Sequence, residues 1–468
     1  MQKSIYTVKH FFSDFLVALK GKETGFTSGS IGRAAFMLAV PMVMEMVMES
    51  LFAVTDIYFV GMISVDAIAT VTLTESVMMI VYSIAIGLSM AATAMVSRRT
   101  GENDPTSASF SAAQAIILTI FVSLLFCIAG IFYAPDILKA MGGSPSVINS
   151  GQGYTRVMLV GNLSIMLLFL INAIFRGAGN AAVAMRSLWL ANILNILLDP
   201  LLIFGLGPIP AFGVEGAAIA TTIGRGIGVL YQTYCLYSEK SFLRMKWEYF
   251  VPDPAMVLKI LKISIGGIGQ FLIGTASWIF IIRISAVFGT AVLAGYALAF
   301  RTIMFTLLPA WGLSNAAATL VGQNLGANKP ERAEKSVWLC ARYNMIFLGA
   351  VSLLYVLFSE QIVGIFTDDP KVIDFGSMAL RYIGFGFVFY SYGMVIAQAF
   401  NGAGDTRTPT IINFFCFWII EIPAAYLFAE TLGFGPRGIF SVIAVSIVIY
   451  AAVCIVVFRR GKWKTTKI

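Results

Sequence analysis

The amino-acid sequence predicts an all-α membrane protein of twelve transmembrane helices, arranged as two pseudo-symmetric lobes of six helices each. Three observations support this fold class: an apolar composition, twelve long apolar runs, and an internal repeat that relates the two halves. Of the 468 residues, 58% are hydrophobic and only 12% are charged, whereas charged residues make up about a quarter of a soluble domain. We therefore expect a multi-pass protein of the cell membrane (the inner or plasma membrane), with most of its surface in contact with lipid.

Each apolar run is long enough to cross a bilayer as a helix. A helix needs about 20 apolar residues to span roughly 30 Å of hydrocarbon, and it satisfies its own backbone polar groups where lipid cannot. Runs longer than about 25 residues predict tilted helices or helices that extend beyond the membrane. The runs lie near residues 36–60, 66–97, 108–132, 153–175, 184–206, 214–238, 258–285, 291–322, 334–357, 378–401, 409–430 and 436–458.

A polar, basic connector separates the first six runs from the last six. Charged residues also interrupt the N-terminal stretch, which predicts an interfacial helix or a flexible tail rather than a signal peptide. The expected regions are an N-terminal cytosolic segment (1–31), an N-lobe (32–237), a cytosolic connector (238–257), a C-lobe (258–459) and a cytosolic tail (460–468).

Lysine and arginine residues indicate the orientation of the spans. If the N-terminus is cytosolic, the cytosolic loops are rich in these residues, whereas the outer loops hold only Lys139, Lys371 and Arg437. This bias predicts that both termini are cytosolic, and it explains the net charge of +8 without nucleic acid. The cytosolic set is Arg98, Arg99, Arg176, Arg186, Lys240, Arg244, Lys246, Lys329, Arg332, Lys335, Arg407, Arg459, Arg460, Lys462, Lys464 and Lys467.

Other residue types favour no cofactor chemistry. The five cysteines lie in or near apolar runs without paired spacing, and the single histidine, His10, lies in the polar N-terminal stretch. Disulfides, a metal centre and a haem are therefore not expected. The chain also has no Gly-Lys-Ser/Thr loop that would bind a phosphate group, so we expect no ATPase within it and no bound cofactor.

An internal repeat relates the two halves at one constant offset. Residues 87–92 match residues 312–317, and residues 175–180 match residues 400–405, each pair lying 225 positions apart (312 − 87 and 400 − 175). Six spans per half is an even number, so both halves insert the same way up, around an axis along the membrane normal. Parallel repeats of this kind enclose a midplane cavity that opens alternately to each side. Gly101, Asn103 and Pro105 match Gly326, Asn328 and Pro330 at the same offset.

The first run holds three acidic residues on one helical face. At 100° per residue, Glu49 and Asp56 lie within about 40° of Glu45, and Met48 and Phe52 flank them. Because an ionisable group costs about 2.5–3.5 kcal/mol inside a membrane, this face is expected to point into protein or water. Glu45 and Glu49 are therefore candidate cavity acids.

The fifth run holds a second polar face. Asn192, Asn195 and Asp199 are spaced three and four residues apart, so they line one side of a helix. A carboxyl group away from water favours its neutral form, and two carboxyl groups with an amide oxygen can hold a proton or a small hard cation. The alternative interpretation is a structural polar cluster that joins two helices.

Further polar residues inside the runs are less specific. Glu75, Arg283, Arg301 and Glu421 are expected to pair with one another or to line the cavity. Each of the remaining residues is a candidate for the substrate cavity, with ordinary helix packing as the alternative. They are Gln270, Tyr296, Tyr390, Gln398, Met48 and Phe52.

Several motifs together resemble the multidrug and toxic compound extrusion (MATE) family. Pro41 is followed by TDIYFVG at 55–61, FRGAGN at 175–180, NILLDP at 195–200 and GVEGAAIAT at 213–221. The likeness runs from about residue 30 to 460. It implies a MATE-like fold of two six-helix lobes, and export of cationic and aromatic compounds against a proton or sodium gradient.

The resemblance also implies roles for particular residues. Asp56 and Asp199 are similar to the coupling acids of the family's N-lobe, Asn195 to their amide partner, and Tyr154 and Thr221 to the rest of that cluster. The other branch of the family places cation-binding acids in the seventh and tenth helices, whereas the matching runs here have no carboxylate. We therefore expect the branch with N-lobe acids (DinF-like rather than NorM-like).

The coupling ion is expected to be H+, with Na+ as the alternative. A proton needs one carboxyl group, whereas a metal cation needs a shell of several oxygen ligands. In the second case Asp56, Asp199 and Asn195 would hold the sodium ion. The additional acids Glu45 and Glu49 also favour protons, because each carboxyl group is a further possible protonation site on the same helical face.

A secondary antiporter is the main interpretation of the function, acting as a monomer on small organic, often cationic, substrates. A passive channel would need a continuous polar pore. A flippase for lipid-linked precursors would favour a strongly cationic cavity and extra spans. An enzyme would need a nucleophile–base pair or a metal constellation, and none is evident in the sequence.

Overall fold

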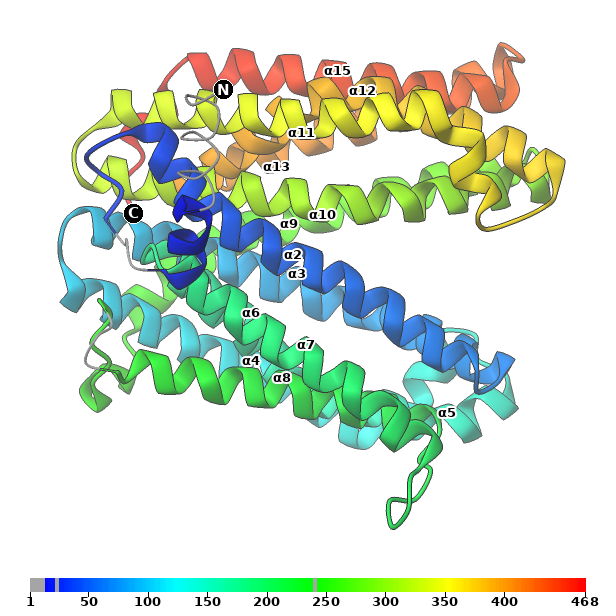
Figure 1. The fold of residues 1–468 in the computed structure, drawn as a ribbon, viewed down its shortest axis with the longest axis horizontal. Helices are drawn as coiled ribbons and strands as arrows, with labels where there is room; N and C mark the ends of the chain where they lie inside the picture. The colour runs from blue at the N-terminus through cyan, green and yellow to red at the C-terminus, as the bar shows by residue number, and fades with distance from the viewer. Residues whose placement is uncertain (1–12, 22–24, 239–241) are drawn as a thin grey trace.

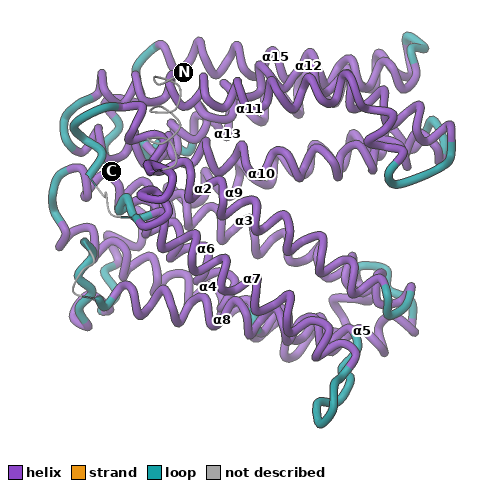
Figure 2. The backbone as a smooth tube through the Cα atoms, in the orientation of Figure 1, coloured by secondary structure: helices purple, strands orange, loops and turns teal. Residues whose placement is uncertain are grey.

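The computed structural model describes residues 13–21, 25–238 and 242–468, so His10 and Lys240 lie outside the described residues. The described chain folds into helices joined by short loops, in two lobes of six spans, which confirms the predicted fold class (Figures 1 and 2). The N-lobe contains α2 (Ile31–Gly61), α3 (Val65–Gly101), α4 (Pro105–Ala140), α5 (Pro145–Val160), α6 (Asn162–Gly177), α7 (Ala181–Phe204) and α8 (Val214–Leu236). The C-lobe contains α9 (Pro254–Ala286), α10 (Thr290–Gly326), α11 (Pro330–Gly364), α12 (Pro370–Gly402), α13 (Arg407–Asn413), α14 (Ile422–Tyr426) and α15 (Gly435–Arg459).

Two of the spans are interrupted. Helices α5 and α6 form one span that breaks at Gly161, and α13 continues through two π-helical segments and α14 as far as Thr431. Among the described residues, eleven spans are long and apolar enough to cross a membrane, judged by length and composition. Helix α8 is the twelfth, and its lower hydropathy is explained by its glycines and by polar residues such as Arg225 and Gln232.

The helices extend past the apolar runs that predict them. Helix α11, for example, covers Pro330–Gly364, whereas the run covers only 334–357. An apolar run reports the thickness of the hydrocarbon layer, and a helix continues beyond it until a capping group ends it. Asp104 is such a cap: its carboxyl accepts a hydrogen bond from the Ser107 amide at 2.9 Å, and this bond and the one to the Ser107 hydroxyl lower the pKa of Asp104.

The two lobes meet at one end of the molecule and diverge toward the other (Figure 1). Small residues permit the close approach: a Cβ atom added to Gly312 of α10 would overlap the carbonyl oxygen of Met42 in α2. Gly87 of α3 lies equally close to the backbone of Ser264 in α9. The C-terminus lies at this end (Figure 1), which we call the closed end.

Terminal segments also pack against the closed end. Phe26 is buried, and its amide donates to the side chain of Gln323 at 3.3 Å. The Arg332 guanidinium donates to the carbonyl oxygens of Ser28 and Gly29 at 2.8 and 2.9 Å. On the other side, Arg98 donates to the carbonyl oxygen of Thr466 in the C-terminal tail. Both ends of the chain therefore hold the closed end together.

Candidate functional site

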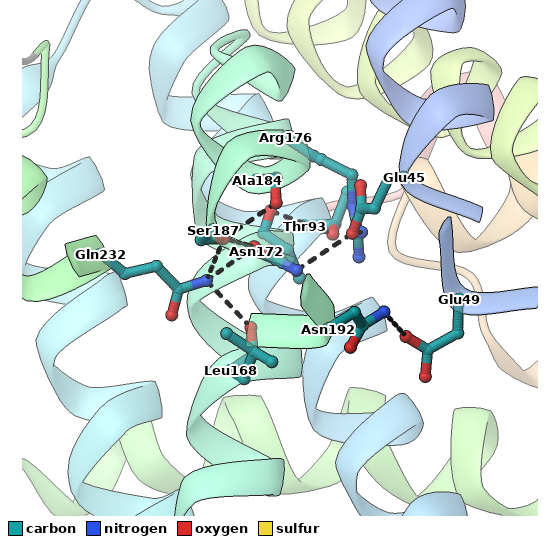
Figure 3. A network of polar contacts seen from close by, with 11 residues as sticks. Glu45, Glu49, Thr93, Leu168, Asn172, Arg176, Ala184, Ser187, Asn192 and Gln232 are labelled. Carbon is teal, nitrogen blue, oxygen red and sulfur yellow. Dashed lines mark hydrogen bonds and ion pairs between the residues drawn. The ribbon is translucent and has the colours of Figure 1, made fainter. Parts of the chain in front are cut away.

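The N-lobe interior contains a buried ion pair between α2 and α6. Arg176 donates to Glu45 Oε1 at 2.7 Å, and Asn172 donates to the same oxygen at 3.0 Å (Figure 3). Glu45 is only 1% exposed. In this conformation its charge is balanced by Arg176 of α6, and the assignment of Glu45 to an open cavity stays a prediction.

Asn172 extends this contact to two further helices. Its side-chain oxygen accepts hydrogen bonds from Ser187 of α7 at 2.9 Å and from Gln232 of α8 at 2.6 Å (Figure 3). Gln232 also donates to the carbonyl oxygen of Leu168 at 3.2 Å. The network thus connects α2, α6, α7 and α8 through buried polar groups that bond to one another, while Glu45 Oε2 and Gln232 Oε1 accept no hydrogen bond from a described residue.

A second ion pair joins α2 to α8. Arg225 donates to Glu49 at 2.8 Å, and Asn192 of α7 donates to the other oxygen of that carboxylate at 3.0 Å. The guanidinium of Arg225 also lies over the rings of Phe52 and Phe169, 5.0 and 5.6 Å from their centroids. These contacts stabilise the buried charge of Arg225, although its Nη1 atom donates to no described residue. Glu49 is therefore a paired acid, and the ring of Phe52 packs against the arginine that pairs with it.

Sequence analysis missed both arginine partners. Arg176 is assigned to a cytosolic loop by the charge pattern, but it lies in the last turn of α6 and turns inward to Glu45. Arg225 lies between two glycines inside the sixth apolar run. The sequence did indicate a partner for Arg225, because a cation inside a membrane span is usually paired with an acidic residue of a neighbouring span.

The predicted coupling residues of α7 and α8 lie together. Asn195 donates to Asp199 at 3.3 Å and to the Thr221 hydroxyl at 3.1 Å. All three side chains are buried, and Asp199 is 0% exposed. The spacing of four residues within α7 places Asn195 and Asp199 on the same face, and the crossing of α8 brings Thr221 to them.

Asp56 and Tyr154 approach this group from α2 and α5. The half-buried Asp56 lies within electrostatic range of Asp199 and Arg225, and the buried Tyr154 lies within range of Asp56 and Asp199. Within the described part of the chain, no hydrogen bond joins Asp56 or Tyr154 to the other members.

Glu75 of α3 belongs to the same region. It lies within electrostatic range of both Asp56 and Arg225. It therefore faces the polar interior of the N-lobe, where Arg225 of α8 lies within electrostatic range of acids on α2 and α3.

Two side-chain oxygen atoms in this group of residues accept no hydrogen bond from the described residues. Asp199 Oδ2 and Asn195 Oδ1 are buried, and neither accepts a hydrogen bond from any described residue. An unsatisfied buried acceptor costs about 1–3 kcal/mol, so the pair is suited to a proton or to a small cation with oxygen ligands. We call the residues Asp56, Tyr154, Asn195, Asp199 and Thr221 the N-lobe polar cluster.

The candidate cavity residues of the C-lobe have other surroundings. Tyr296 is buried and stacks on Phe440, with centroids 5.9 Å apart. Gln398 is buried and accepts a hydrogen bond from Asn401 at 3.2 Å. In this conformation both side chains take part in helix packing inside the C-lobe, and their assignment to the substrate cavity stays a prediction.

The remaining candidate cavity residues differ in how far their side chains are buried. Tyr390 is half-buried beside Tyr450, with ring centroids 6.0 Å apart. Gln270 is half-buried, and its side-chain oxygen has no donor among the described residues. Met48 is buried on α2, where its carbonyl oxygen accepts a hydrogen bond from Asn192 at 3.4 Å.

Comparison with known proteins places the chain among transport proteins. The MatE family model matches residues 41–201 and 263–427, one stretch in each lobe. The probable multidrug resistance protein NorM of Thermotoga maritima is 27% identical over 430 residues, which cover 91% of this chain and 92% of NorM. The multidrug export protein MepA of Staphylococcus aureus is 23% identical, covering 93% of this chain and 96% of MepA. The FAD transporter of Shewanella oneidensis is 24% identical, covering 86% and 89%.

Solved structures resemble both lobes at once. The outward-facing conformation of a multidrug resistance MATE family transporter matches with a TM-score of 0.88 at 25% identity, covering 95% of this chain and 99% of that chain. A structure of MATE in complex with MaL6 matches with a TM-score of 0.89 at 25% identity, covering 95% and 100%. The similarity therefore extends over nearly the entire chain.

Proposed function

Because this chain belongs to the MatE family, and is thus a multi-pass membrane transporter rather than an enzyme, we propose that it is a secondary antiporter for amphipathic organic compounds. Relatives that act in multidrug resistance and export support drug-like, often cationic substrates. The two lobes alternate between opening to one side of the membrane and to the other. In the orientation that the basic loops predict, the closed end faces the cytosol and the described conformation opens outward.

The N-lobe polar cluster is the proposed coupling site. The observation that carries this proposal is the pair of buried, donor-free oxygen atoms on Asp199 and Asn195. Asp199 and Asp56 exchange the coupling ion, Asn195 and Thr221 orient Asp199, and Tyr154 closes the cluster from α5. Glu45 and Glu49 are excluded from coupling, because Arg176 and Arg225 already neutralise them.

Protons are the proposed coupling ion, with sodium as the alternative. The seventh and tenth apolar runs contain no carboxylate, which favours the branch of the family whose coupling acids lie in the N-lobe. One charge that moves across 100 mV contributes about 2.3 kcal/mol, which is enough to concentrate a substrate roughly fiftyfold. A single exchanged proton is therefore a sufficient driving force for export.

Dye efflux from proteoliposomes tests the proposal. A pH gradient and a sodium gradient are imposed separately on the purified protein, at clamped voltage. We expect the pH gradient to drive export and Asp56→Asn to abolish it, because the carboxamide keeps the shape of the side chain but holds no exchangeable charge. The matched control is Asp136→Asn, the same change at an exposed aspartate of α4. Export driven equally by sodium at constant pH would contradict the choice of proton.

An organic anion is a second candidate substrate, favoured by Arg301. This side chain is exposed, and no ion pair joins it to any described residue. It lies eleven residues before Gly312, hence about 20° around α10 from the face that meets α2. An arginine there suits a carboxylate or phosphate group, as the relative that transports FAD would require. In the efflux assay, inhibition by FAD that is lost in Arg301→Gln would support the anion.

A further inference from the structure

One carboxyl group of the C-lobe is buried without any partner. Glu421 lies in the eleventh span and is only 3% exposed. No hydrogen bond or ion pair joins its carboxyl group to a described residue, in contrast to Glu45 and Glu49 of the N-lobe. A bare charge in such a position costs several kcal/mol, so the surroundings require the group to be neutral.

The helix is irregular where Glu421 lies. The segment Phe414–Glu421 is π-helical, and the amide of Ile422 bonds to the carbonyl oxygen of Phe417, five residues earlier. Pro423 follows and has no amide hydrogen to donate, which removes a regular α-helical bond at this turn. Such π-helical turns are rare, and they occur frequently at functional sites.

The neighbouring groups are all neutral hydroxyls and thiols. Tyr296 of α10, Tyr390 of α12 and Cys416 lie within electrostatic range of Glu421. On α15, the ring of Tyr450 contacts that of Tyr390, and Cys454 lies within electrostatic range of Tyr390. The seventh-span helix α9 contacts this segment through its backbone, where the carbonyl oxygen of Ile273 accepts a hydrogen bond from Trp418 at 3.0 Å. None of these groups supplies a positive charge.

Two arginines inside the C-lobe spans form no ion pair with the carboxyl group. Arg283 of α9 and Arg301 of α10 are both exposed. No charged side chain lies within electrostatic range of Glu421 among the described residues. The expectation that Glu421 pairs with one of these arginines is therefore not met.

The internal repeat gives the position a counterpart in the N-lobe. At the offset of 225 residues, position 421 corresponds to Ile196, which is adjacent to Asn195 in the N-lobe polar cluster (421 − 225 = 196). Both lobes thus place a buried polar group at the same level of the fifth helix of the repeat. In the N-lobe that level holds Asn195 and Asp199, and in the C-lobe it holds a single acid.

We propose that Glu421 is a second proton-binding site, located in the C-lobe and separate from the N-lobe polar cluster. Its carboxyl group carries a proton in the conformation described here, where it is buried. It releases that proton to water, as a carboxylate and a hydronium ion, in a conformation that hydrates the eleventh span. Only this second step rests on the proposed antiport function.

Infrared spectroscopy of the purified full-length protein at neutral pH tests the first step. A protonated carboxyl group has a C=O stretch that is distinct from that of a carboxylate and shifts in heavy water. We expect Glu421→Gln to remove the absorption of one carboxyl group from that region. The matched control is Glu430→Gln, which changes an exposed acid at the end of the same span and leaves the region unchanged. An undiminished band in a folded Glu421→Gln protein would overturn the site.

Proton counting in proteoliposomes tests the second step. A pH-sensitive dye reports the protons exchanged for each molecule exported. We expect Glu421→Gln to retain export and to exchange fewer protons per molecule than the wild type, whereas Asp56→Asn loses export. If the infrared band disappears while the proton count stays the same, Glu421 is a static buried acid and its release is refuted. The infrared result does not depend on transport. Failure of the antiport proposal can therefore be distinguished from failure of the proton-binding site at Glu421.

Discussion

Charged side chains inside the N-lobe differ in whether a partner neutralises them. Glu45 and Glu49 each contact an arginine and an asparagine, and their charges are balanced within the lobe. Asp199 instead accepts a hydrogen bond from an asparagine and forms no ion pair with any described residue. A paired acid resists any change of charge, whereas an unpaired acid can gain or lose a proton or cation at lower cost. Acidic side chains therefore stabilise the packing at one level of the lobe, and under the proposed function another acid exchanges the coupling ion.

Removing one partner of the ion pair between Glu49 and Arg225 is expected to destabilise the protein more than replacing both partners. Arg225→Met leaves Glu49 buried without a cation, which costs about 3–5 kcal/mol. Changing both residues to methionine is expected to recover most of that loss, because an apolar pair of similar volume needs no desolvation. Thermal unfolding of the purified protein measures both effects.

The exposed pair between Arg381 and Glu360, at 2.7 Å, is the control for this experiment. An exposed ion pair contributes about 0–1 kcal/mol, so Arg381→Met should hardly change the unfolding temperature. Equal losses for Arg225→Met and Arg381→Met would contradict the structural role of the buried pair.

Asp199 is expected to be essential for export but not for folding. Asp199→Asn keeps the hydrogen-bonding shape toward Asn195 and removes the charge that exchanges. We expect gradient-driven dye efflux to fall to the level of empty liposomes, while the unfolding temperature stays close to that of the wild type. Export at the wild-type rate, with equal protein incorporated, would refute the role of Asp199.

Residue-scale contacts were predictable where sequence spacing determines them. Asn195 and Asp199 share a face because they lie four residues apart in one helix. The partner of Glu49 was not predictable in this way, since a helical period indicates a face but not the neighbouring helix that meets it. Tyr296 shows the same limit, because its face packs on Phe440 of a helix about 140 residues later in the chain.

At the scale of helices, glycines set how closely the lobes approach. Gly312 of α10 meets the backbone of α2, and Gly87 of α3 meets that of α9. The repeat places these two glycines at equivalent positions, 225 residues apart. Each lobe therefore contributes the same small residue to the closed end, where two backbones can come into contact and separate again.

Gly312→Ala is expected to loosen the closed end. The added methyl group overlaps the carbonyl oxygen of Met42, so α2 and α10 must move apart. We expect faster labelling of Ala316→Cys, a position that is buried in this contact, in a protein whose native cysteines are replaced. The control is Gly274→Ala, because a Cβ atom there meets no other atom. Equal labelling in the two variants would show that the contact at Gly312 does not limit opening.

The helices themselves were largely predictable, because lipid requires long apolar runs and the repeat fixes their number per lobe. The irregularities within the helices were not predictable from the sequence. The break at Gly161 and the π-helical turns around Glu421 depend on packing and on a missing amide hydrogen, and neither leaves a periodic signal. Pro423 was the available indication that the eleventh span is not a regular helix.

In the whole molecule, both ends of the chain fasten the closed end. Phe26 is buried in one cluster with Ala18 and with Ala181 of the N-lobe, while its amide bonds to Gln323 of the C-lobe. The N-terminal segment thus touches both lobes. Alternating access requires the lobes to separate at this end, so these contacts must break in every transport cycle if the proposed function is correct.

Arg332 is expected to control how readily the closed end opens. Its guanidinium holds the carbonyl oxygens of Ser28 and Gly29, which keep the N-terminal segment over Ala181. Arg332→Gln removes at least one charge-assisted hydrogen bond, each worth about 1.5–3 kcal/mol. Because 1.4 kcal/mol is about a tenfold change in an equilibrium, we expect at least a tenfold larger open fraction at this end.

Thiol labelling of Ala181→Cys, again without the native cysteines, measures that fraction. The buried position should react about tenfold faster or more in Arg332→Gln. Arg342→Gln is the matched control, because Arg342 is an exposed arginine of the same helix with no hydrogen bond or ion pair to the described residues. If both variants label at the wild-type rate, the N-terminal segment does not restrain the lobes. The glycine contacts between α2, α3, α9 and α10 would then hold the closed end without it.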